Sequence, residues 1–193
     1  MPRINTTTRE QVREGLRLAA RKVLNSRGFS GLTVRAVATE AGCSVGTLYT
    51  YFPDKGALVR ELAVDSLGEF GRAVSEEMHG VLELGEVSLA AARAARRVYG
   101  TGQPAAPLLP VLLNPEGAGN EEFRRRVTGR LIVALGPVAA AHRHGGHARG
   151  AANAETVAIA SFLFGLVLLE SSGQLVRLEV PASEAVAAFV RSG

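Results

Sequence analysis

Two short helical patterns between residues 28 and 58, separated by a glycine-centred turn, constrain the fold more than any other feature of this chain. Thr33 is a suitable N-cap for the first pattern, because its hydroxyl can accept a backbone N–H. Gly42 permits a sharp turn after it, since glycine tolerates positive φ. Ser44 can cap the second pattern, and Pro53 ends it by disfavouring helical backbone in the preceding residue. This spacing predicts a helix-turn-helix.

The second helix of this motif has one apolar side and one side rich in hydroxyl groups. Leu48 and Phe52 lie one turn apart and are expected to face the core, which leaves Thr47, Thr50 and Tyr51 facing outward. Short helices of this kind fit the major groove of DNA. This one carries no Arg, Asn or Gln for bidentate base reading, so its specificity would rest on van der Waals contacts, water or DNA shape.

The net charge is distributed unevenly along the chain. It is +4 over 193 residues, but residues 1–60 hold ten Lys or Arg and four Asp or Glu, which gives +6 for this part and −2 for the rest. An N-terminal excess of positive charge is typical of proteins that bind polyanions. A solvated basic surface would give the same charge balance, so the charge supports DNA binding only together with the predicted helix-turn-helix.

Composition and motifs argue against several other classes of protein. The single Cys43 excludes an internal disulfide framework and a cysteine-based zinc site. The N-terminus lacks the apolar segment of a signal peptide, and the longest apolar run is too short to span a bilayer, so we expect a cytoplasmic protein without a membrane partner. No nucleophile elbow, phosphate-binding glycine motif or acid–base pair of carboxylates stands out, so we predict neither an enzyme nor a cofactor.

Three histidines are close together in the sequence, at His142, His144 and His147. Their segment is rich in glycine and arginine and contains no carboxylate. A solvated loop is therefore favoured over a metal site.

The remainder of the chain is expected to be helical. Thr7 or Thr8 would start the first helix as part of a capping box, and Gly28 would end it. Low aromatic content (5%) and the lack of an alternating strand pattern support an all-α fold. Separated by Gly and Pro residues, further helices are predicted at 86–100, 107–113, 119–142, 153–172 and 182–191.

The N-terminal part, about residues 9–64, resembles the TetR family of one-component bacterial transcriptional regulators. The resemblance rests on the aromatic residue after Gly28, the Thr33 cap, the A-x-x-A-G-x-S turn at 38–44 and G-T-L-Y-x-Y-F at 46–52. Elsewhere the chain matches the family only in its length and in its predicted succession of helices.

The resemblance implies two domains and a function on DNA. A three-helix helix-turn-helix DNA-binding domain would occupy 1–54, and a helical effector-binding and dimerisation domain would occupy 55–193. The implied protein is a homodimeric repressor, bound to a palindromic operator in double-stranded DNA and released by an unknown small-molecule effector. Two alternatives stay open: a DNA-binding regulator without an effector, controlled by a partner protein, and an enzyme or carrier that reuses the helical domain.

The residues expected to touch DNA follow from the motif and the resemblance together. The start of the recognition helix should approach base edges, whereas Tyr49 and Lys55 match phosphate contacts of the family. Tyr51 could equally pack across the motif. The predicted DNA-binding residues are Thr33, Arg35, Ser44, Val45, Gly46, Thr47, Tyr49, Tyr51 and Lys55.

The run 156–169 is apolar on nearly all sides, which is too much for one intramolecular face. It would therefore pair with a second subunit, although a central buried helix of a monomer would have the same pattern. The resemblance implies that the helix predicted at 182–191 joins this interface. The predicted dimer contacts are therefore Ala158, Ser161, Phe162, Gly165 and Leu169 and, by resemblance, Phe189. By resemblance, the effector pocket would be lined by Leu62, Phe70, Tyr99, Gln103, Leu112, Phe123, Arg130, Phe162 and Leu166.

Overall fold

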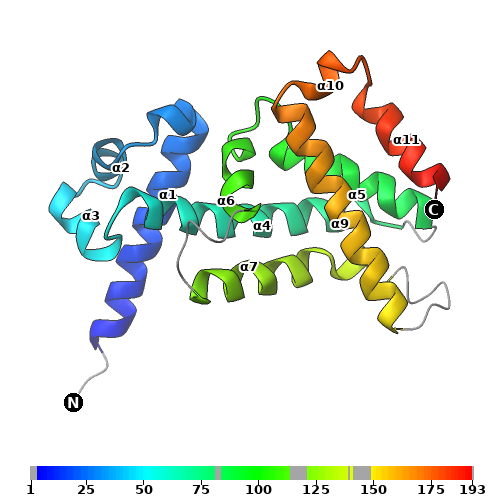
Figure 1. The fold of residues 1–193 in the computed structure, drawn as a ribbon. Helices are drawn as coiled ribbons and strands as arrows, with labels where there is room; N and C mark the ends of the chain where they lie inside the picture. Colours follow the sequence, from blue (N-terminus) through cyan, green and yellow to red (C-terminus); the bar gives the residue numbers. More distant parts are fainter. Residues whose placement is uncertain (1–3, 81–83, 114–120, 139, 141–148, 193) are drawn as a thin grey trace. The chain divides into compact units, whose positions relative to one another are not determined.

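The regular structure of the chain is helical wherever the computed structural model describes it, in residues 4–80, 84–113, 121–138, 140 and 149–192 (Figure 1). These ranges contain no strand, so the predicted all-α fold is confirmed. The chain forms two compact units, Met1–Ala63 and Val64–Gly193. The helices are α1 (Ile4–Gly31), α2 (Val34–Glu40), α3 (Val45–Tyr51), α4 (Lys55–Glu77), α5 (Leu84–Tyr99), α6 (Leu109–Leu113), α7 (Glu121–Ala134), α9 (Arg149–Ser171), α10 (Gln174–Arg177) and α11 (Ala182–Ser192), with a 3₁₀ turn at Ala106–Leu108.

Helix α1 is longer than the sequence predicted. It begins at Ile4, so the predicted start at Thr7 or Thr8 is wrong. Threonine costs only a few tenths of a kcal/mol inside a helix, roughly, so cap-forming residues at this end do not force the helix to stop before them. The expected break at Gly28 is confirmed, because this residue interrupts the helical backbone with φ +67°.

The N-terminal unit has a continuous apolar core. Leu48 and Phe52 are fully buried, as the one-turn spacing predicted. Apolar side chains of α1, such as Leu16 and Val23, are buried in the same unit, and so is Val37 of α2. Helix α3 therefore keeps its apolar side in the core and leaves its other side toward the surface of the unit.

The C-terminal unit is centred on aromatic rings and on small residues of α5. The rings of Phe70 and Tyr99 have centroids 6.1 Å apart, and Phe164 lies 5.9 Å from Phe70. The hydroxyl groups of Ser66 and Tyr99 are 3.0 Å apart in a buried hydrogen bond. Alanines at 90–95 are buried along α5, which lets the packed helices approach closely.

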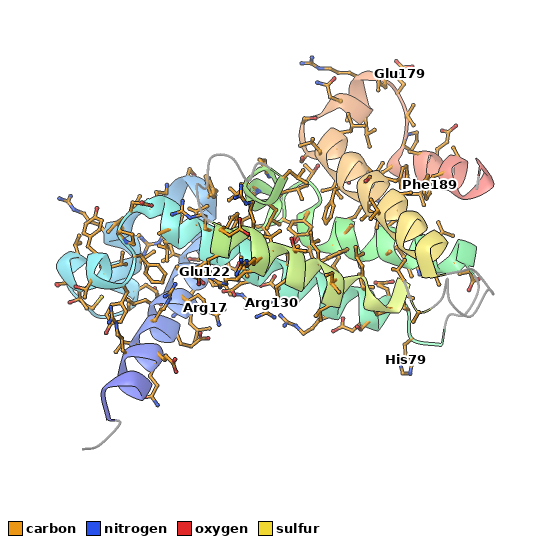
Figure 2. The ribbon with its side chains drawn as sticks, turned by 60° about the horizontal axis from the view of Figure 1, so that its bottom comes forward. Arg17, His79, Glu122, Arg130, Glu179 and Phe189 are labelled. Atoms are coloured by element: carbon orange, nitrogen blue, oxygen red, sulfur yellow. The ribbon has the colours of Figure 1, made fainter. Side chains whose placement is uncertain are left out.

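Two details of this unit differ from the prediction. The single helix expected at 119–142 is wrong, since α7 ends at Ala134 and a turn precedes helical backbone at 136–138. Gly136 favours this break, and Pro137 has no N–H with which to continue the helical ladder. Helix α10 was not predicted; it follows Gly173, whose φ is +72°, and Glu179 (Figure 2) has φ +55° in the turn after it.

Helix α9 has one buried apolar face and one exposed apolar face. Ile159, Leu163 and Leu166 are buried at helical spacing. On the other side, Leu168 and Leu169 are each 41% exposed, although both are large and apolar. Within the described ranges, no helix combines the length and the hydropathy that crossing a bilayer requires.

Candidate nucleic-acid interface

The ends of α2 and α3 are fixed by side-chain caps. Thr33 Oγ1 accepts a hydrogen bond from Ala36 N at 3.1 Å, and Ser44 Oγ accepts one from Thr47 N at 3.0 Å. Gly42 has φ +66° in the turn between the two helices. Each of these features was predicted, and together they hold the start of α3 at the surface of the N-terminal unit.

The outer side of α3 is small and polar. Gly46 and Thr50 are exposed, and Thr47 is half-buried. Thr50 Oγ1 donates to the Gly46 carbonyl at 3.1 Å, and the hydroxyls of Ser44 and Thr47 are 2.9 Å apart. These hydroxyls are held by their own helix, and the methyl groups of Thr47 and Thr50 and the remaining acceptor positions can still meet a base edge.

Lys55, the first residue of α4, lies against an aromatic ring. Its Nζ is 5.3 Å from the centroid of the Phe29 ring, within the range of a cation–π interaction. Asp54 Oδ1 caps the same helix by accepting from Ala57 N at 2.6 Å. Phe29 is the aromatic residue that follows Gly28, and no spacing rule in the sequence connects it with Lys55. The ring restricts where the ammonium group can reach.

Part of the positive charge of this unit is already neutralised. Arg13 forms an ion pair with the buried Glu61 at 2.5 Å, and its guanidinium lies 5.4 Å from the Phe52 ring centroid. Lys22 pairs with Glu40 at 2.6 Å. The formal charge therefore overstates what is available to a polyanion, and Arg13 contributes to the local fold.

All nine residues predicted to bind DNA lie in the N-terminal unit, between 33 and 55. Tyr49 is 48% exposed, whereas Tyr51 is half-buried, which fits the alternative that Tyr51 packs across the motif. None of the nine is buried; Thr33, Arg35, Ser44, Gly46, Tyr49 and Lys55 are exposed, and Val45, Thr47 and Tyr51 are half-buried.

The residues predicted to line an effector pocket do not share one environment. Phe70 and Tyr99 are fully buried against each other, and burial raises the pKa of the Tyr99 hydroxyl, which the hydrogen bond with Ser66 partly offsets. Gln103 and Arg130 are instead exposed. Leu62, Leu112, Phe123 and Leu166 are buried and Phe162 is half-buried.

The predicted dimer residues occupy the exposed side of α9 and one face of α11. The rings of Phe162 and Phe189 (Figure 2) stack with centroids 4.1 Å apart. Ala158, Ser161 and Leu169 are exposed, and Phe162, Gly165 and Phe189 are half-buried. The histidines at 142, 144 and 147 lie outside the described residues; inside them, no cluster of three metal-ligating side chains occurs.

Comparison with protein families gives this geometry a context. Residues 16–62 match the family model for bacterial regulatory proteins of the tetR family. This match identifies a tetR-type DNA-binding domain of transcription regulators within the N-terminal unit. Helices α2 and α3 are the helix-turn-helix of this domain.

Solved structures extend the similarity of fold to nearly the whole chain. A protein of unknown function from Rhodococcus sp. RHA1 superposes with a TM-score of 0.63 at 20% identity, over 94% of this chain and 92% of that one. A candidate tetR family transcription regulator from Shewanella sp. PV-4 gives 0.57 at 18%, over 94% and 97%. A candidate transcriptional regulator from Pseudomonas aeruginosa PAO1 gives 0.58 at 22%, over 95% and 88%. No curated protein sequence matches the chain significantly.

Proposed function

We propose that this tetR-family chain is a homodimeric repressor that binds a palindromic operator and leaves it when a small-molecule effector binds. The observation that carries the proposal is the outer side of α3, where exposed small and hydroxyl-bearing residues follow a capped N-terminus. Such a surface can enter the major groove closely. Because the target is genomic DNA, the protein would act in the cytoplasm.

Base contacts would come from the start of α3 and phosphate contacts from residues around it. Gly46 and Thr47 lie where a recognition helix approaches base edges, and Gly46 has no side chain to hold the backbone away. Tyr49 and Lys55 would contact phosphates, since both are exposed and can donate hydrogen bonds. Arg35 and Thr33, at the start of α2, would add further backbone contacts.

The salt dependence of binding tests the role assigned to Lys55. Lys55→Ala should weaken binding to all DNA sequences and reduce the slope of log K against log salt by about 1. Lys55→Arg keeps the charge and serves as the matched control, with a slope close to that of the wild type. Equal slopes for the wild type and Lys55→Ala would remove this residue from the interface.

Dimerisation would use the exposed apolar side of α9 with α11. Leu168 and Leu169 are large apolar side chains left uncovered on a helix whose opposite face is already buried. Leu169→Glu should produce a monomer of half the mass in light scattering at micromolar concentration. Val176→Glu is the control, because Val176 is 82% exposed on α10, outside the proposed interface. A wild-type monomer would reject the dimer.

A regulator without a small-molecule effector, controlled by a partner protein, is the second candidate. It is favoured by the packing of Phe70 and Tyr99, two of the predicted pocket residues, against each other and against Phe164. Ligand-dependent release from the operator would decide against it.

The deciding experiment for the function is selection of genomic DNA fragments on the purified protein, followed by sequencing. A short palindrome enriched upstream of particular genes supports an operator-binding regulator. Retention without sequence preference contradicts the operator, and the absence of retention at low salt contradicts DNA binding itself. The operator obtained in this way then serves in release assays with candidate effectors.

A further inference from the structure

A groove of about 440 Å³ lies between α4 and α7 in the C-terminal unit. The two helices touch at Gly71, where an added Cβ would lie 3.1 Å from the Cα atom of Ala134. At Gly68, about one turn earlier, the atoms nearest to an added Cβ are guanidinium nitrogens: Arg130 Nη1 at 3.6 Å and Arg72 Nη1 at 3.9 Å. Both arginines therefore place a guanidinium nitrogen near the same point above Gly68 in the groove; Arg130 is labelled in Figure 2.

The two arginines differ from other arginines of this unit. Arg93 is paired with Glu77 at 2.8 Å, and Arg96 is paired with Glu170 at 2.9 Å. Within the described part of the chain, neither Arg72 nor Arg130 has a carboxylate partner. Two guanidinium groups that converge without an anion repel each other, so this arrangement favours binding of a negative group between them.

One carboxylate does lie on the rim of the groove. Glu76 belongs to its lining, but Arg97 donates to Glu76 Oε2 at 2.6 Å. The charge of Glu76 is therefore already compensated by an arginine of α5. It does not cancel the positive charge of Arg72 and Arg130.

Apart from Ser75, whose hydroxyl donates to the Gly71 carbonyl of its own helix at 3.0 Å, the rest of the groove is apolar. Its lining includes Leu67, Ala134 and Val133, and Val133 is 74% exposed although it is large and apolar. An exposed apolar wall beside two cations fits a molecule with an acidic head and a hydrocarbon body, and the volume lies within the range of small-molecule sites. Guanidinium groups suit a carboxylate because their N–H groups match its two oxygens.

We propose that this groove binds an amphiphilic carboxylate, whose acid group lies between Arg72 and Arg130 and whose hydrocarbon part lies along Val133. The inference rests on the proposed function in one respect: the bound carboxylate would be the effector. It places that effector in the groove between α4 and α7, beside the packed aromatic cluster of Phe70, Tyr99 and Phe164.

Calorimetric titration of the full-length protein with decanoate tests the site. We expect saturable binding that weakens about tenfold or more in Arg72→Gln and again in Arg130→Gln, because each substitution removes a charge-assisted hydrogen bond. Arg125→Gln is the matched control, because Arg125 is an exposed arginine of α7 outside the groove. The affinity of this variant for decanoate should stay within about twofold of the wild type.

Two further arms separate the contributions of charge and hydrocarbon. Decanol, which lacks the acid group, and inorganic phosphate, which lacks the chain, should each bind at least about tenfold more weakly than decanoate. Val133→Glu should also weaken the binding of decanoate, because it adds a competing carboxylate beside the arginines. Decanoate binding that is unchanged in the Arg72→Gln, Arg130→Gln double variant, or no binding by the wild type, overturns the proposal.

Operator affinity is measured on the same samples by fluorescence anisotropy. If decanoate binding depends on the two arginines and decanoate also releases the operator, both the site and its role as an effector site are supported. Arginine-dependent binding with unchanged operator affinity supports the site and rejects that role. Operator binding without any decanoate binding rejects the groove site and leaves the DNA-binding function standing.

Discussion

The two compact units hold their polar side chains in different ways. In the N-terminal unit, the hydrogen bonds that shape α3 are local. Ser44 Oγ caps the helix by accepting from Thr47 N, and Thr50 Oγ1 donates to the carbonyl of Gly46. In the C-terminal unit, Arg96 bonds to Glu170, 74 residues later in the chain. Local bonds survive as long as their own helix does, whereas distant bonds require the whole unit to be packed. The surface of α3 should therefore respond to mutation locally, whereas residues such as Arg96 and Glu170 should respond together with the packing of the C-terminal unit.

The largest test of this comparison is Phe70→Ala. Phe70 is fully buried and contacts two other rings, so its removal should lower the free energy of unfolding by about 3–5 kcal/mol. Urea denaturation followed by circular dichroism measures the loss. Val176→Ala, at an exposed position, should change stability by less than about 0.5 kcal/mol. A loss below about 1 kcal/mol for Phe70→Ala would mean that the ring cluster does not hold the unit together.

Ser44→Ala tests the local side of the comparison. It removes the α3 cap and should cost about 0.5–2 kcal/mol, with faster amide hydrogen exchange confined to α3. Ser26→Ala in α1 is the control, because Ser26 Oγ bonds back to the Lys22 carbonyl, and alanine is the better helix former. Exchange that increased throughout the C-terminal unit in Ser44→Ala would contradict a local response.

Tyr99→Phe removes one buried long-range hydrogen bond and should cost about 1 kcal/mol. Tyr49→Phe, at an exposed position, should cost almost nothing. Burial raises the pKa of folded Tyr99, so above about pH 10 the unfolded chain loses this proton first and stability falls as the pH rises. In Tyr99→Phe, the free energy of unfolding should therefore fall less steeply above about pH 10 than in the wild type. Urea midpoints measured at several pH values test this. An equal fall in stability in both proteins would mean that other groups cause it.

The smallest effects concern two glycines on α4. Gly68→Ala should stabilise the protein by about 0.5–1 kcal/mol, because alanine favours the helix and its Cβ would meet only arginine side-chain tips at ordinary contact distance. Gly71→Ala should destabilise it, since its Cβ would press on the backbone of α7 at Ala134. Thermal melts of the two variants compare the signs directly. If both substitutions raised the melting temperature, helix propensity alone would decide the change in stability at both positions.

The sequence predicted the caps and the turn of the helix-turn-helix in residue detail because their determinants are local. Thr33 and Ser44 are cap residues at fixed offsets, and Gly42 supplies a backbone angle that other residues rarely adopt. The predicted boundary at residue 54 and the compact units found here differ, because α4 starts at Lys55 and contributes to both units. A helix shared by two cores carries no marker in its sequence at the point where one core ends.

The C-terminal unit was predicted only as a set of helices. Arg130 was predicted to line the effector pocket, but Arg72 was not, because their common approach to Gly68 depends on how α4 packs against α7. The contact between Lys55 and Phe29 was missed for the same reason. Side chains that meet across distant helices leave no periodic pattern, whereas caps and turns do.

The division of labour on α3 has a consequence for how such a protein diversifies. Leu48 and the Ser44 cap maintain the fold, while Gly46 and Thr47 contribute little to the core. Under the proposed function, mutations at these two positions would therefore alter the choice of operator at little cost to folding. After gene duplication, one copy could drift toward new target promoters while remaining stable at every step.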